Sequence, residues 1–138
     1  MKILVGHDGS EQAEKALKRA VDLAVALKAS IIALSVVPDL CMMEISVDDC
    51  KNMYKTMTDE SEKRLSALKV ELSKKGVEME TAVKFGNAAE TIINTCVDKK
   101  ADMIVVGSHG RHGAKKFLLG SVSSKVVEHA PCDVLVVK

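Results

Sequence analysis

Short apolar runs alternate with longer amphipathic segments along the whole chain. Five runs stand out: KILVG (2–6), IIALSVV (31–37), VEMETAVKF (77–85), DMIVVG (102–107) and CDVLVVK (132–138). Most of them are nearly continuous in valine, isoleucine and leucine, which is typical of strands buried on both faces of a parallel sheet. Strands that alternate with helices predict an α/β domain whose helices cover both faces of one sheet.

The segments between these runs have helical periodicity. They are 10–28, 53–75, 88–100 and 121–130. Ser10 stands at an N-cap position, and Gly76 is expected to end the second helix as its C′ residue. Residues 38–53 have no clear period and are expected to form a loop or an irregular helix entry. The order βαβαβαβαβ therefore predicts a doubly wound, five-stranded parallel sheet in strand order 3-2-1-4-5, with strand 77–85 as a candidate edge strand.

Length and composition limit the class of protein. A chain of 138 residues is expected to form a single domain over 1–138. No apolar run approaches the ~18 residues of a membrane span, so no membrane association is expected. The N-terminus MKILVGHDGS lacks the apolar core of a secretory signal, which predicts a cytoplasmic protein.

Charge and cysteine usage argue against several other classes. The formal net charge is +1 and only three residues are aromatic, so neither a basic face nor a base-stacking platform is expected, and nucleic acid is excluded as a partner. The four cysteines, Cys41, Cys50, Cys96 and Cys132, form no CxxC pair. They are expected to be free thiols, and their spacing does not suit a structural zinc site.

Glycine is concentrated in the loops that follow two of the predicted strands. These loops are GHDGS (6–10) and GSHGRHG (107–113), and in the order 3-2-1-4-5 both open on the crevice where the strand order reverses. LLGSVSS (118–124) then places a glycine and serine hydroxyls at a helix start, where unpaired amides favour an anion such as phosphate. Neither the P-loop spacing nor GxGxxG is present.

The spacing Gly107-x2-Gly110-x9-Gly120-Ser121, with ILVGHDGSEQAEKAL at the start and APCDVLVVK at the end, resembles the universal stress protein family over the full length. The resemblance implies a flavodoxin-like sheet, similar to that of the adenine nucleotide alpha hydrolases, which binds ATP in the crevice. Asp8 would lie near the phosphates or a Mg²⁺ ion, and the backbone of Val36 would read the adenine edge. The resemblance further implies contacts to ribose and phosphate from Val106, Gly107, His109, Gly110, Gly120, Ser121, Val122 and Ser123.

The resemblance also implies a homodimer paired through the last strand, 132–138. An exposed apolar edge strand needs such a cover, which supports the same expectation. The function expected is that of an adenine nucleotide-binding regulatory protein in the stress response, which switches conformation or protein partner with nucleotide occupancy. A slow Mg²⁺-dependent ATP hydrolase or phosphotransfer enzyme, and a dimeric interaction module without nucleotide, are the alternatives.

Several residues have a simpler interpretation beside the functional one. The turn Asp8-Gly9-Ser10 is also what a helix-capping turn looks like, with no ligand involved. Arg111, His112, Lys115 and Lys116 either screen phosphate charge or form a solvated rim. Met42 and Met43 could either contribute to a surface that binds a partner or fill gaps in the packing, and the sequence does not decide between the two.

Overall fold

The computed structural model describes residues 1–39, 45–109 and 119–138. Its strands are β1 (Lys2–Gly6), β2 (Ser30–Val37), β3 (Met79–Phe85), β4 (Met103–Gly107) and β5 (Asp133–Val137). Its helices are α1 (Glu11–Leu27), α2 (Val47–Ser73), α3 (Ala88–Lys99) and α4 (Ser121–His129). The predicted elements are therefore confirmed, and most of their boundaries agree within one or two residues.

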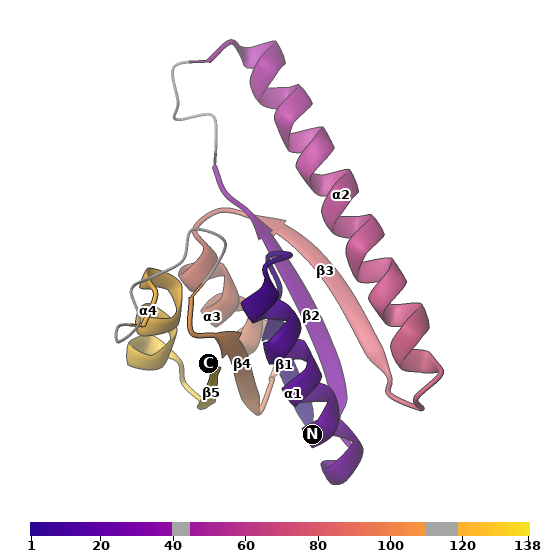
Figure 1. Cartoon of the computed structure of the whole chain (residues 1–138). Coiled ribbons are helices and arrows are strands. Elements are labelled where there is room, and N and C mark those ends of the chain that lie inside the picture. Colours follow the sequence, from indigo (N-terminus) through magenta and orange to yellow (C-terminus); the bar gives the residue numbers. More distant parts are fainter. Residues whose placement is uncertain (40–44, 110–118) are drawn as a thin grey trace.

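All strand pairs in the sheet are parallel, and their order is β3-β2-β1-β4-β5. The helices α1 and α2 cover one face, and α3 and α4 cover the other (Figure 1). This is the doubly wound α/β fold that the alternation of strands and helices predicts. Because β1 pairs with both β2 and β4, the strand order reverses beside β1, and a crevice is expected at the carboxyl ends of β1 and β4.

The central strands explain why their sequences are continuously apolar. Ile3 and Val5 pack into the core beneath α1 and α2, whereas Leu4 between them packs into the core beneath α3 and α4. All three side chains have no exposed surface. Since successive side chains of a strand point to opposite faces, a strand covered on both sides has few positions for a polar residue, and the buried Ser35 of β2 is hydrogen-bonded to Ser61.

The second helix begins six residues earlier than its apolar period indicates. Ser46 caps it, and its hydroxyl accepts a hydrogen bond from the Asp49 amide at 3.1 Å. The first turns of α2 extend past the carboxyl ends of the strands (Figure 1). There Val47 is 70% and Met53 41% exposed, so no apolar stripe was needed in this part of the helix. The prediction that the segment up to 53 is a loop or irregular entry is wrong from Val47 onward.

Capping predictions are confirmed at the start of α1 and need a correction at the end of α2. The Ser10 hydroxyl accepts a hydrogen bond from the Ala13 amide at 3.1 Å. Helix α2 ends at Ser73 with Lys74 as its C-cap, so Gly76 lies one position beyond the expected C′. Its φ of +74° still makes it the residue that turns the chain toward β3.

The cysteines are not all free. Cys96 and Cys132 carry free thiols, as predicted. Cys50 is disulfide-bonded, which corrects the prediction for that residue, and Cys41 lies outside the described residues. No helix in the described ranges is both long and apolar enough to cross a membrane.

Candidate functional site

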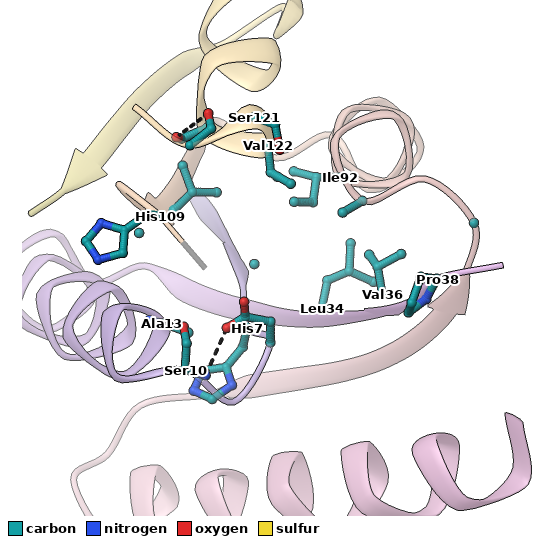
Figure 2. A pocket seen from close by; sticks show the side chains of 18 residues that line it. His7, Ser10, Ala13, Leu34, Val36, Pro38, Ile92, His109, Ser121 and Val122 are labelled. Atoms are coloured by element: carbon teal, nitrogen blue, oxygen red, sulfur yellow. Dashed lines mark hydrogen bonds between the residues drawn. The ribbon is translucent and has the colours of Figure 1, made fainter. Parts of the chain in front are cut away.

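A pocket of about 490 Å³ opens at the carboxyl ends of β1, β2 and β4. Figure 2 shows the start of α4 on one side of it and the β1–α1 turn on the other. Its lining residues come from every part of the sheet's carboxyl edge except β5: Gly6, His7, Asp8, Ser10, Ala13, Leu34, Val36, Pro38, Gly86, Ala88, Ile92, Val106, Gly107, His109, Gly120, Ser121, Val122 and Ser123. The crevice predicted at the strand-order reversal is therefore present.

The β1–α1 turn presents the carboxylate of Asp8 at the edge of the pocket. One of its oxygens, Oδ1, accepts a hydrogen bond from the Ser10 amide at 2.9 Å. Gly9 between them has φ +83°, a conformation that glycine adopts without strain. The turn thus caps α1 and also carries an exposed acidic group that lines the pocket. This geometry is compatible both with a purely capping role and with a role in binding.

His7 lies beneath this turn and is 2% exposed. Its Nδ1 accepts a hydrogen bond from the Gly9 amide at 3.3 Å, so Nε2 carries the proton and donates to Glu14 Oε1 at 3.1 Å. Burial lowers the pKa of His7, because loss of hydration disfavours the imidazolium; Arg64 lowers it further, whereas Glu14 and Asp8 raise it. A neutral ring therefore holds the turn from below.

The end of β4 packs directly against α1, which explains the glycine there. A Cβ on Gly107 would lie 2.9 Å from the Cβ of Gln12 and 3.1 Å from its backbone carbonyl. Backbone cannot move aside as a flexible side chain can, so any larger residue would push β4 away from α1. The main reason for a glycine at position 107 is therefore the close approach of β4 to α1, and Gly107 also lines the pocket.

Ser108, directly after β4, is bonded to the start of α4 by two hydrogen bonds and to β5 by a third. Its carbonyl accepts from the Gly120 amide at 2.7 Å and from the Ser123 hydroxyl at 2.9 Å, and its amide donates to the Val137 carbonyl at 2.8 Å. A Cβ on Gly120 would lie 3.2 Å from this carbonyl oxygen and from the Cα of His109. The Gly120 amide and the Ser123 hydroxyl are therefore engaged within the protein.

The amides that remain at the mouth of the pocket are those of the first turn of α4. Gly120 is the N-cap and supplies no side-chain cap. The first-turn amides of a helix have no partner within the helix, so those of Ser121, Val122 and Ser123 depend on a cap or a ligand. Ser121 and Val122 line the pocket beside them (Figure 2). This end of the pocket favours negative charge.

The opposite end of the pocket is an apolar slot. Leu34, Val36, Pro38 and Ile92 line it, from β2, the residue after β2, and α3 (Figure 2). Gly6 adds room here, because a Cβ at that position would lie 3.1 Å from the terminal methyl group of Ile92. Apolar walls of this kind suit a flat, poorly hydrated group rather than a charged one.

The backbone N–H and C=O of Val36 face this slot. β1 pairs with β2 only as far as Leu34, whose carbonyl accepts from the His7 amide at 2.8 Å. Val37 points its carbonyl the other way, to the Gly86 amide at 3.0 Å. Backbone groups alternate in direction along a strand, so the N–H and C=O of Val36 point to the β1 side, past the end of β1. Within the described sheet no strand pairs with them there.

The structure brings together every predicted site residue that it describes: Asp8, Val36, Val106, Gly107, His109, Gly120, Ser121, Val122 and Ser123 all line the pocket. Gly110 lies outside the described residues. The sequence reasoning missed the apolar wall of Leu34, Pro38 and Ile92, and it also missed Gly86 and Ala88. A signal existed for the last two, since GNAAE directly follows β3 and begins at the carboxyl end of that strand.

Comparisons with known proteins agree with this geometry. Universal stress protein YxiE of Bacillus subtilis is 36% identical over 148 residues, which cover 99% of this chain and 98% of that protein. Universal stress protein UspA from Lactobacillus plantarum has the same fold, with a TM-score of 0.91 at 25% identity over 100% of this chain and 97% of its own. A universal stress protein solved in complex with cAMP matches with a TM-score of 0.68 at 26% identity, over 100% and 97% of the two chains. Residues 1–138 match the model of the universal stress protein family, and the chain belongs to that family.

Proposed function

We propose that this protein binds an adenine nucleotide in the pocket at the carboxyl edge of the sheet and acts as a nucleotide-dependent regulatory protein of the stress response. The observation that carries the proposal is that one pocket joins two unlike ends. One end is an apolar slot with the backbone N–H and C=O of Val36 at its side, and the other is the start of α4. A nucleotide has the same polarity, with a flat base at one end and phosphate at the other.

The base is assigned to the apolar slot. Adenine has a hydrogen-bond acceptor, N1, beside a donor, the N6 amino group. The N–H and C=O of Val36 offer the complementary donor and acceptor in the direction of the slot. Leaving these backbone groups without partners would cost about 1–3 kcal/mol each, so a base that pairs with both is favoured over one that pairs with neither.

The phosphates are assigned to the first turn of α4. The amides of Ser121, Val122 and Ser123 and the Ser121 hydroxyl are the proposed donors. The Gly120 amide and the Ser123 hydroxyl are engaged with Ser108, so they take a positioning role in place of the donor role that the sequence suggested. Gly107 and His109 line the pocket between the two ends.

A Mg²⁺ ion is proposed to enter with the nucleotide. In the described part of the chain, no three His, Cys, Asp or Glu side chains gather to hold a metal on their own. Asp8 fits a different kind of site, because Mg²⁺ prefers oxygen ligands and is commonly held by one or two carboxylates together with substrate phosphates. The exposed Asp8 carboxylate at the pocket edge would supply the protein ligand.

ATP is the nucleotide we propose, and the related protein solved with cAMP supports the adenine base more than any number of phosphates. The test is to denature the purified protein, identify released nucleotides by mass spectrometry, and titrate ATP, AMP, cAMP and ITP into the emptied protein by calorimetry. ITP lacks the N6 amino group and carries a proton on N1, so it mismatches Val36 twice and should bind tens of times more weakly or worse. Absence of both released nucleotide and binding heat for every adenine nucleotide would reject the proposal.

We also propose that two copies pair through the last strand. β5 ends the described sheet order, and the side chains from Val134 to Val137 are only partly buried. An apolar edge strand without Pro or bulge pairs readily with a copy of itself across a two-fold axis. Sedimentation analysis at micromolar concentration is expected to give a dimer, and a monomer would reject this part of the proposal.

A further inference from the structure

A pair of free thiols lies near the amino ends of the strands, whereas the pocket lies at their carboxyl ends. Cys96, on the last turns of α3, and Cys132, between α4 and β5, have their sulfur atoms 3.2 Å apart. Both belong to the apolar cluster between the sheet and the helices α3 and α4. Cys96 is 2% exposed, whereas Cys132 is partly accessible.

The surroundings place each sulfur through contacts with the backbone, which include a hydrogen bond from Ile104 to Cys132. Cys96 Sγ lies 3.6 Å from the carbonyl oxygen of Ala101, and Cys132 Sγ lies 3.5 Å from that of Asp133. Those are weak thiol hydrogen bonds. The sulfur–sulfur contact is the shortest of the three, and the two atoms need to approach by only about 1 Å to reach the ~2.05 Å of a disulfide.

We propose that Cys96 and Cys132 form a modification site, at which hydrogen peroxide converts the two thiols into an intramolecular disulfide. The sulfur of Cys132 attacks one peroxide oxygen, an S–O bond forms, the O–O bond breaks, and one water leaves. The sulfur of Cys96 then attacks the resulting sulfenic acid, the S–S bond forms, the S–O bond breaks, and a second water leaves with the thiol proton. Two electrons pass from the sulfur pair to the peroxide.

The reaction is slow at neutral pH, and the structure gives the reason. Burial, the hydrogen bond with Cys96 and the charge of that neighbour raise the pKa of Cys132 to about 12. The thiolate is the reactive form of a cysteine. At pH values below the pKa, the thiolate fraction increases about tenfold with each unit of increase in pH, and the reaction rate is expected to follow it. The pair therefore responds to prolonged rather than brief oxidation.

The cross-link would join α3 to the connector between α4 and β5. It would close a loop of about 36 residues that contains β4 and α4, and constraining such a loop lowers the entropy of the unfolded chain. The melting temperature is expected to rise by several degrees on oxidation and to return on reduction. This inference does not depend on nucleotide binding.

The test uses the intact protein without prior reduction. It is incubated with hydrogen peroxide for hours at pH 7, 8 and 9, then alkylated, digested and mapped by mass spectrometry. A peptide linking Cys96 to Cys132, two hydrogens lighter than the separate peptides, is expected to form about ten times faster per pH unit. Cys132→Ser should show neither the link nor the rise in melting temperature, while Cys50→Ser should show both.

Two results would overturn the proposal. One is a soluble, folded protein in which Cys96 and Cys132 remain separately alkylated while peroxide is consumed elsewhere. The other is a disulfide that joins either residue to a different cysteine or to a second chain. A rate that does not change with pH would overturn the assignment of Cys132 as the attacking thiol.

Discussion

Ser121→Pro removes the backbone amide of Ser121, together with the hydroxyl, from the proposed phosphate site and leaves the helix intact. Ser121 is the first residue of α4, where proline is well tolerated because its missing N–H has no partner within the helix. The preceding Gly120 has φ −64° and ψ 165°, close to the extended conformation that a residue before proline prefers. The substitution therefore introduces little strain, and the melting temperature should change by no more than about 2 °C.

The expected loss of affinity follows from the charge of the acceptor. A hydrogen bond to a charged group contributes about 1.5–3 kcal/mol, so losing the Ser121 amide should make Ser121→Pro bind ATP about 10- to 150-fold more weakly than Ser121→Ala, in which the hydroxyl alone is missing. Calorimetric titration of MgATP into the nucleotide-free protein measures this directly. Ser121→Ala, which removes only the hydroxyl, and Ser121→Val, which adds bulk, both keep the amide and should bind more tightly than Ser121→Pro. If the proline variant is folded and binds as tightly as the wild type, the first turn of α4 does not hold phosphate.

Three further predictions test other parts of the molecule. Asp8→Asn keeps an oxygen for the Ser10 amide but removes the charge, so it should weaken MgATP binding about tenfold and leave binding in EDTA nearly unchanged; equal losses in calorimetry would argue against Mg²⁺ at Asp8. The Val137 carbonyl faces β4, so the N–H of the neighbouring Val136 points away from β4, toward the outer side of β5. Val136→Pro removes this N–H, and sedimentation should therefore show a folded monomer, whereas the control Val136→Ala should remain a dimer. The pKa of buried His7 is lowered from 6.5, so the unfolded chain binds the extra proton first and stability falls as pH drops through about 6.5. Urea unfolding at pH 7.5 and at pH 5.5 measures this loss of stability, and His7→Gln should make the difference between the two pH values smaller. An unchanged difference would contradict the assignment of the pH dependence to His7.

The sequence was most informative where burial leaves one choice of residue. The central strands are buried on both faces, so apolar runs such as Ile3, Leu4 and Val5 were enough to predict the sheet. The glycines of the site were also readable, although for a partly different reason. Gly107 and Gly120 are required by contacts with Gln12 and with the Ser108 carbonyl, as well as by their place in the pocket.

Other features could not be read from the sequence because they depend on where neighbouring elements end. The slot at Val36 exists because β1 stops pairing after Leu34, and no local pattern records the relative lengths of two strands. The early start of α2 was hidden for a similar reason. A helix that extends past the sheet has no core to face, so its first turns carry exposed residues such as Val47 and Met53 and no apolar period.

Ser108 connects β5 and the start of α4 through the backbone of one residue. Its amide is bonded to Val137 at the end of β5, and its carbonyl is bonded to Gly120 and Ser123 at the start of α4. A displacement of β5 on pairing with a second copy would thus reach the proposed phosphate end of the pocket through the backbone of this one residue. By thermodynamic reciprocity the influence runs equally in both directions, so occupancy of the pocket and the monomer–dimer equilibrium would be linked functions. The apparent nucleotide affinity would then depend on protein concentration, and the protein would sense its own abundance together with that of the nucleotide.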